Sequence, residues 1–138
     1  MFKHTILLID DDPDDQELFC ELIHDMNENY YCVTANDGRE AIDLLLHSKE
    51  NLPRLILLDL HMPRMNGFEF LKVVSQDEQL NSIPIVVYAT SKQLIAKLLE
   101  TPGINNIPYD VIVKPLAWND LKESLTSVIE RLLPTYVT

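Results

Sequence analysis

The chain has few cysteines, few basic residues and no long apolar run. Its 138 residues include only Cys20 and Cys32, whose spacing fits neither a metal site nor a redox motif and makes no disulfide framework. No apolar stretch approaches the ~20 residues that a membrane helix needs. Because residues 1–4 run almost directly into an apolar segment, we expect no secretory signal. The simplest expected location is therefore a reducing cytoplasm, with no membrane partner.

Acidic residues outnumber basic ones, 22 to 11, which gives a formal net charge of −11. Such a surface repels phosphate backbones, so we expect no direct binding to nucleic acid. The acid is concentrated between Asp10 and Glu17, where only Pro13 and Gln16 are uncharged. Charge runs are usually solvated faces, but this one directly follows an apolar segment, and that position favours a functional site.

Short apolar runs alternate with segments of helical periodicity along the whole chain. Five runs predict strands over residues 5–9, 30–35, 55–58, 85–88 and 109–113. Between and after them, apolar residues at helical spacing predict five helices, with Leu18 on the inner face of the first and Leu46 on that of the second. The alternation implies crossover connections and a parallel sheet that is covered on both faces. We expect one domain over residues 1–138, with a flexible tail after residue 134.

Three acids follow two of the predicted strands. Asp10 and Asp11 follow the first strand and Asp59 ends the third, so in a doubly wound sheet they converge at its carboxyl edge. Clustered carboxylates repel one another unless a cation joins them, and oxygen ligands suit magnesium. The alternative is that these acids are solvated helix caps, a role that fits Asp12 and Asp14 better.

The loop from Asp10 to Asp15 contains no glycine and would repel an unaccompanied phosphate. It is therefore not a glycine-rich phosphate cradle, and a flavin site loses its main support. Lys114, which precedes Pro115 after the fifth strand, could reach towards Asp59 and balance its charge or that of a phosphoryl group on it. The alternative for Lys114 is an exposed lysine in a turn.

These segments together resemble the receiver domain of response regulators, in particular stand-alone receivers of the chemotaxis and phytochrome-regulator type. Three segments carry the resemblance: Ile9-Asp10-Asp11, Leu57-Leu58-Asp59-Leu60-His61-Met62-Pro63-Arg64-Met65-Asn66-Gly67 and Val113-Lys114-Pro115. Their order and spacing span nearly the whole chain. The resemblance implies an α/β, flavodoxin-like, doubly wound sheet of five parallel strands in the order 2-1-3-4-5, with five helices.

The resemblance also implies roles for individual residues. Asp59 would accept a phosphoryl group from a phosphohistidine on a sensor histidine kinase or phosphotransfer protein. Asp10, Asp11, Asp59 and the backbone carbonyl of His61 would hold Mg²⁺, and Lys114 would pair with the phosphoryl oxygens. Such a protein is a phosphoacceptor with at most slow self-phosphorylation and dephosphorylation, not an enzyme, and it signals through a downstream protein.

Two positions depart from the family pattern. Receivers usually end the fourth strand with a threonine or serine, where this chain has Ala89, and they carry an aromatic residue where it has Val111. Thr90 is adjacent to Ala89, but neighbouring strand residues point to opposite faces. The hypothesis is that the chain signals by another route or has a weak switch. The alternative is a pseudo-receiver that binds partners without phosphorylation.

Two further alternatives stay open. Asp10 and Asp12 fit the spaced aspartate pair of haloacid-dehalogenase-type phosphatases, as nucleophile and acid, although Pro13 and Asp14 do not continue that motif. The face around Tyr109 and Trp118 is a candidate homodimer surface, with core packing as the more common role of such a face.

Overall fold

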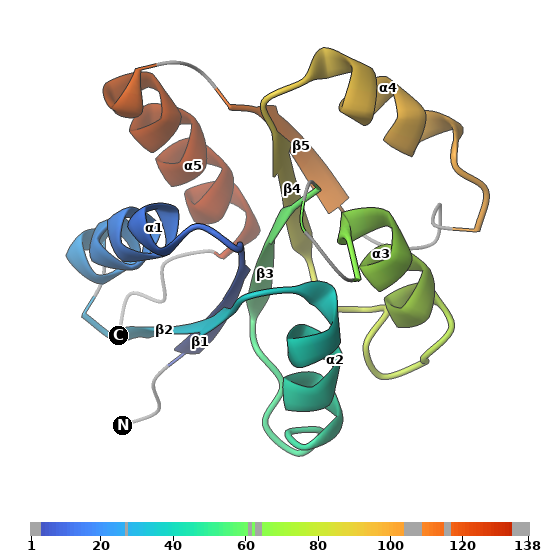
Figure 1. The fold of residues 1–138 in the computed structure, drawn as a ribbon. Helices are drawn as coiled ribbons and strands as arrows, with labels where there is room; N and C mark the ends of the chain where they lie inside the picture. Colours follow the sequence, from blue (N-terminus) through green and yellow to red (C-terminus); the bar gives the residue numbers. More distant parts are fainter. Residues whose placement is uncertain are drawn as a thin grey trace.

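The computed structural model describes residues 4–26, 28–60, 62, 65–103, 109–114 and 117–133. Five parallel strands form one sheet in the order β2-β1-β3-β4-β5, and five helices cover it (Figure 1). The predicted flavodoxin-like fold is confirmed. In chain order the elements are β1 (His4–Ile9), α1 (Pro13–Met26), β2 (Tyr30–Ala35), α2 (Gly38–Leu46), β3 (Leu55–Asp59), α3 (Gly67–Ser75), β4 (Ile85–Ala89), α4 (Lys92–Glu100), β5 (Tyr109–Val113) and α5 (Trp118–Leu132).

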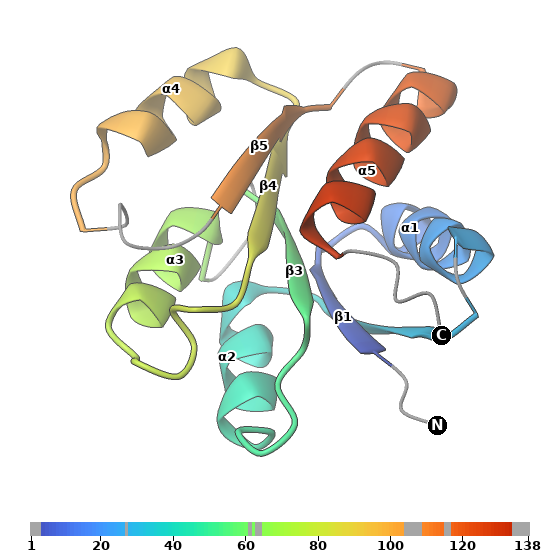
Figure 2. The ribbon, with the colours of Figure 1, turned by 180° about the vertical axis from the view of Figure 1, so that it is seen from behind.

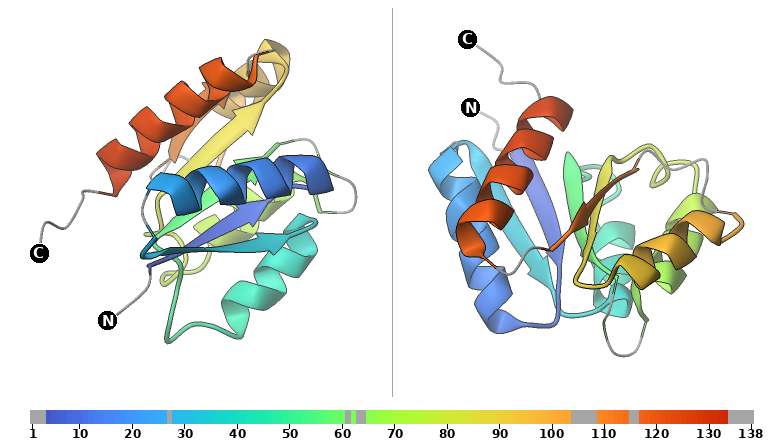
Figure 3. Two further views of the ribbon diagram at one scale, coloured as in Figure 1. Left: turned by 90° about the vertical axis from the view of Figure 1, so that its left-hand side faces the viewer. Right: turned by 90° about the horizontal axis from the view of Figure 1, so that it is seen from above.

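The helices lie in two layers. Helices α1 and α5 cover one face of the sheet, and α2, α3 and α4 cover the other (Figures 1 and 2); the side view in Figure 3 shows α1 and α2 on opposite sides of it. In strand β4, successive residues pack alternately against the two helix layers. Ile85, Val87 and Ala89 pack into the core on the α2–α4 side, whereas Val86 and Tyr88 pack into the core on the α1–α5 side. All five residues are buried, as expected for a central parallel strand.

Backbone hydrogen bonds extend the sheet one residue beyond its strands. The Asp10 N–H donates to the Ala35 carbonyl at 3.0 Å, and the Lys114 N–H donates to the Ala89 carbonyl at 2.7 Å. Asp59 itself pairs with Tyr88 in the β3–β4 register. These bonds bring the ends of β1, β3 and β5 to one edge of the sheet. Asp59 is the last residue of β3, and Asp10, Asp11 and Lys114 directly follow β1 and β5.

Two apolar residues expected on inner helix faces are exposed. Leu18 is 38% exposed and Leu46 is 48% exposed. The buried stripe of α1 is formed by Phe19, Leu22 and Ile23, and Leu18 precedes it by one residue, which is about 100° around the helix. Leu46 is the last residue of α2, where the helix leaves the core.

The cysteines also differ from the expectation. Cys20 of α1 and Cys32 of β2 form a disulfide, with their Cα atoms 5.5 Å apart. This bond could not be predicted from the sequence, because a separation of 12 residues says nothing about how closely α1 packs on β2.

Trp118, named as part of a candidate dimer face, is half-buried and stacks on Phe19 with ring centroids 6.0 Å apart. Among the described helices, none has the length and apolar character needed to cross a membrane.

Candidate functional site

Three carboxylates meet at the carboxyl edge of the sheet. One oxygen each from Asp10, Asp11 and Asp59 can be chosen so that all three lie within 4.8 Å of one another. Asp10 is fully buried, Asp59 is half-buried and Asp11 is exposed. The structure therefore brings together the three acids that the strand-end rule predicted.

Asp10 is the most strongly perturbed member of the cluster. Its Oδ1 accepts a hydrogen bond from the Asp12 N–H at 2.9 Å, and its Oδ2 accepts one from the Tyr88 hydroxyl at 2.6 Å. The pKa of Asp10 is raised to about 7, chiefly by burial and in smaller part by the negative charges of Asp59 and Asp15, although both hydrogen bonds favour the ionised form and lower it. A cation at this point would offset both burial and repulsion.

The donor set suits a hard divalent cation. Carboxylate oxygens are the ligands that magnesium and calcium prefer, and each oxygen of Asp10 keeps a second lone pair beyond the hydrogen bond it accepts. The pocket formed by Asp10, Asp11 and Asp59 could therefore bind such an ion. The predicted fourth protein ligand, the carbonyl of His61, lies outside the described residues.

Close backbone packing places Asp59 and Leu60 against the start of α3. A Cβ on Gly67 would lie 2.7 Å from the Leu60 Cα and 2.9 Å from the Asp59 carbonyl oxygen, so only glycine permits this approach. The Asn66 side chain accepts a hydrogen bond from the Glu69 N–H, and the Glu69 side chain accepts one from the Asn66 N–H. This capping box starts α3 at the residue where the loop ends.

The amine of Lys114 lies at the same edge but pairs with a residue that the sequence did not single out. Its Nζ forms a short ion pair with Asp15 Oδ2, in the first turn of α1. The same nitrogen lies 5.8 Å from the ring centroid of Tyr88 and 5.9 Å from that of Phe19. The expected role of Lys114 as a partner of phosphoryl oxygens on Asp59 stays a prediction.

Tyr88 is a second residue of the site that the sequence did not single out. Its side chain is 1% exposed, and burial together with the neighbouring Asp10 carboxylate raises its pKa well above the usual value. A neutral hydroxyl is therefore available to Asp10. One feature of the sequence could have pointed to Tyr88. It is the only polar residue in the aliphatic run of β4, and β4 pairs with β3, the strand that carries Asp59.

The residues that depart from the family pattern occupy the predicted positions. Ala89 is 2% exposed and faces the core on the α2–α4 side, and Val111 packs against the same core. Thr90 is exposed. Within the described chain, the end of β4 therefore presents no hydroxyl at residue 89.

The arrangement of Asp10 and Asp12 does not favour the phosphatase alternative. A nucleophile must be accessible to its substrate, but Asp10 is 0% exposed and both its oxygens accept hydrogen bonds. Asp12 is exposed, and its Oδ1 accepts a hydrogen bond from the Asp14 N–H, as the capping interpretation predicted.

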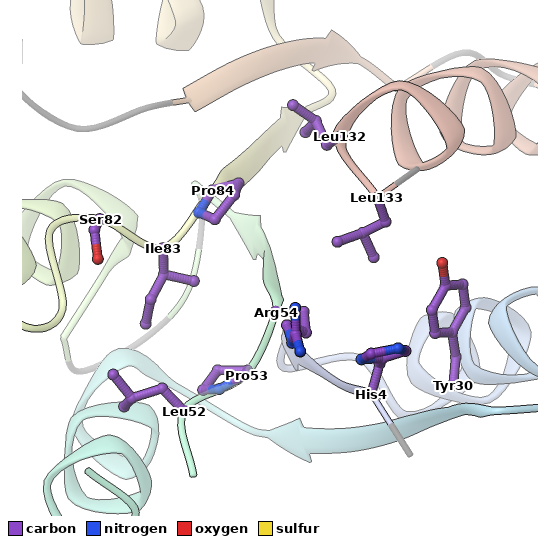
Figure 4. Close-up of a pocket in the computed structure, with 10 residues that line it drawn as sticks. All are labelled: His4, Tyr30, Leu52, Pro53, Arg54, Ser82, Ile83, Pro84, Leu132 and Leu133. Atoms are coloured by element: carbon purple, nitrogen blue, oxygen red, sulfur yellow. The ribbon is translucent and has the colours of Figure 1, made fainter. Parts of the chain in front are cut away.

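A separate pocket of about 350 Å³ lies at the opposite edge of the sheet (Figure 4). It is lined by residues that include His4 at the start of β1, Pro84 before β4 and Leu133 after α5. None of the three clustered acids lines it, so it is a distinct feature from the carboxyl edge.

The fold and the acid cluster define a class: a doubly wound α/β protein with an acidic, metal-competent pocket at the carboxyl ends of its strands. The family model of the response regulator receiver domain matches residues 6–126. The chain belongs to this family of two-component signalling proteins.

Solved structures agree with this assignment. The phosphorylated cyanobacterial phytochrome response regulator RcpA is 27% identical with a TM-score of 0.84, and the alignment covers 96% of this chain and 95% of that one. The Mn²⁺-bound response regulator Rcp1 is 27% identical with a TM-score of 0.81, covering 98% and 97%.

The first curated relatives extend beyond the region that matches this chain. The probable C4-dicarboxylate response regulator DctR of Bacillus subtilis is 29% identical over 120 residues, which are 87% of this chain and 50% of DctR. The chain thus spans about half the length of this relative.

Proposed function

We propose that this chain accepts a phosphoryl group on Asp59 in a Mg²⁺-dependent phosphorelay, with a sensor histidine kinase or phosphotransfer protein as donor. The observation that carries the proposal is the convergence of Asp10, Asp11 and Asp59 at one edge of the sheet. The similar RcpA was solved as a phosphorylated protein and Rcp1 with Mn²⁺ bound, which supports the same chemistry here.

In the proposed step, a carboxylate oxygen of Asp59 attacks the phosphorus of a phosphohistidine. An O–P bond forms and the P–N bond breaks, and the imidazole nitrogen keeps the electron pair and takes up a proton. The product is an aspartyl phosphate and a free histidine. Because charge, rather than covalent chemistry, limits such transfers, the site needs positive charge near Asp59, and the ammonium of Lys114 can supply part of it.

The proposed metal ligands are the carboxylates of Asp10, Asp11 and Asp59, together with the carbonyl of His61. Magnesium, when bound, neutralises charge on the phosphoryl oxygens. Asp10 contributes from a fixed position, because Tyr88 and the Asp12 N–H hold its two oxygens. Asp11 is exposed, and it is the most exposed of the three carboxylates.

The wider role follows from the same assignment. We propose a single receiver domain that acts in the cytoplasm as a phosphoacceptor with at most slow self-phosphorylation, not as an enzyme. Its output is binding to a downstream protein, with no direct contact to nucleic acid or membrane. The face around Tyr109 and Trp118 remains the proposed homodimer surface, although Trp118 packs on Phe19.

Intact-mass measurement after incubation with acetyl phosphate tests the proposal. We expect one added phosphoryl group with Mg²⁺ and none with EDTA. Asp59→Asn should abolish the addition and Asp11→Ala should abolish its dependence on Mg²⁺. Asp43→Asn, which makes the same chemical change at an exposed position of α2, should label normally. Normal stoichiometry in Asp59→Asn would show that the acceptor is another residue.

A pseudo-receiver that needs no phosphorylation is the second candidate, because residue 89 is an alanine at a buried position. The intact acid cluster and Lys114 argue against it. A wild-type mass that stays unchanged with both acetyl phosphate and Mg²⁺, and with a phosphorylated histidine kinase, would favour it.

A further inference from the structure

We propose that Asp15 is a positioning residue, which holds the Lys114 ammonium in the resting protein and competes for it with the phosphoryl group on Asp59. This inference rests on the function proposed above and specifies how the same site is regulated. It concerns a residue that the acid cluster does not include and that lies on a different element from β1 and β3.

The ion pair joins two elements that are far apart in the sequence. Asp15 lies in the first turn of α1 and Lys114 directly follows β5, 99 residues later. The two side chains are only 20% and 22% exposed. Water therefore screens the attraction between these two charges less than it would at a fully exposed pair.

The surroundings of the amine fix it further. The Lys114 backbone N–H donates to the Ala89 carbonyl at 2.7 Å, which ties the backbone at this residue to the end of β4. The rings of Phe19 and Tyr88 lie 5.9 Å and 5.8 Å from Nζ, within the range of cation–π attraction. Among the described residues, Asp15 is the carboxylate that pairs with this ammonium.

Competition follows from charge. Lys114 carries a single positive charge, and Asp15 neutralises much of it in the resting protein. A phosphoryl group on Asp59 adds negative charge at the same edge and draws the ammonium away from Asp15. Asp15 therefore lowers the affinity of the site for a phosphoryl group, and phosphorylation loosens the contact between β5 and the first turn of α1. Movement of the Lys114 ammonium from Asp15 to the phosphoryl group needs no hydroxyl at residue 89.

The test uses fluoroberyllate as a phosphoryl mimic on the full chain, with Mg²⁺ at a saturating level determined for each variant. Trp118 is the only tryptophan of the sequence. Its indole stacks on Phe19, which lies under the Lys114 amine, so its fluorescence reports on movement of that amine. We expect Asp15→Asn to bind fluoroberyllate about three- to tenfold more tightly than wild type, and Asp15→Glu to restore wild-type affinity.

Asp14→Asn is the matched control, because it removes the same charge from the same first turn without touching Lys114. It should change the affinity little. In a Lys114→Gln background, Asp15→Asn should have no further effect on fluoroberyllate affinity. A purely structural or long-range role for Asp15 would persist in that background.

The outcomes separate this inference from the function on which it rests. If wild type binds fluoroberyllate but Asp15→Asn and Asp14→Asn shift the affinity equally, the positioning role is wrong and the phosphoacceptor role stands. The positioning role is equally wrong if the Asp15→Asn effect survives in Lys114→Gln. Absence of both fluoroberyllate binding and phosphoryl uptake by wild type overturns both roles.

Discussion

The Tyr88 hydroxyl makes a specific contribution at the level of single residues. It donates to the Asp10 Oδ2 at 2.6 Å inside the protein, where a carboxylate that loses a donor cannot recover it from water. We expect Tyr88→Phe to lower the free energy of unfolding by about 1.5–3 kcal/mol at pH 8 without metal. Urea denaturation followed by circular dichroism measures this change.

Tyr31→Phe provides the comparison, because Tyr31 is 55% exposed. It should change stability by less than about 0.5 kcal/mol. Equal effects of the two substitutions would show that the Tyr88 hydroxyl contributes no special stabilisation to the buried carboxylate.

The sequence predicted the acid cluster but not the contacts around it, and particular residues show why. Asp10, Asp11 and Asp59 follow strand ends, and in a parallel sheet this alone brings them to one edge. The partners Tyr88 and Asp15 depend on side-chain direction and on how α1 packs against the ends of β4 and β5. A charged residue within an acidic run looks like its neighbours until that packing is known.

At the level of elements, the Cys20–Cys32 disulfide ties α1 to β2. It closes a short loop, with a sequence separation of 12, and chain entropy for such a loop gives a stabilisation of about 2–4 kcal/mol. We expect Cys20→Ser to lower the free energy of unfolding by this amount under oxidising conditions. Denaturation with and without dithiothreitol measures it.

The controls use the same two positions. Cys20→Ser and Cys32→Ser should be equally destabilised, the double variant no more than either, and dithiothreitol should affect wild type alone. In the proposed cytoplasmic setting the thiols are kept reduced, so thiol trapping in cell extracts should find both free. Identical stability of oxidised and reduced wild type would contradict a stabilising bridge.

Element order was predictable because the apolar runs and the helical periodicities alternate without ambiguity along the chain. It was harder to predict which apolar residues of each helix are buried. Leu18 and Leu46 have the right residue type for a core position, but Phe19, Leu22 and Ile23 already fill the inner face of α1. Helical periodicity locates the buried face of a helix only to within about one residue. A leucine at the margin of that face can therefore be either buried or exposed.

On the scale of the whole molecule, the stability of the metal-free protein should depend on pH through Asp10. Its pKa is about 7 in the folded protein and 3.8 as an ordinary value. Between these values the folded state binds more protons than the unfolded state, so the free energy of unfolding falls as pH rises. The contribution is fully present below pH 4 and is lost as pH rises through 7.

Thermal and urea denaturation in EDTA between pH 5 and pH 8 should therefore show wild type becoming less stable by about 2–3 kcal/mol. Asp10→Asn should flatten this profile and be more stable than wild type at pH 8, because a neutral amide carries no charge to desolvate. Saturating Mg²⁺ should remove most of the wild-type slope, since a bound cation favours the ionised carboxylate. Asp43→Asn should keep the wild-type slope, because that acid is exposed. A profile that is flat for wild type in EDTA, or equally steep for Asp10→Asn, would mean that another group controls the pH dependence and that Asp10 is ionised at little cost in the folded chain.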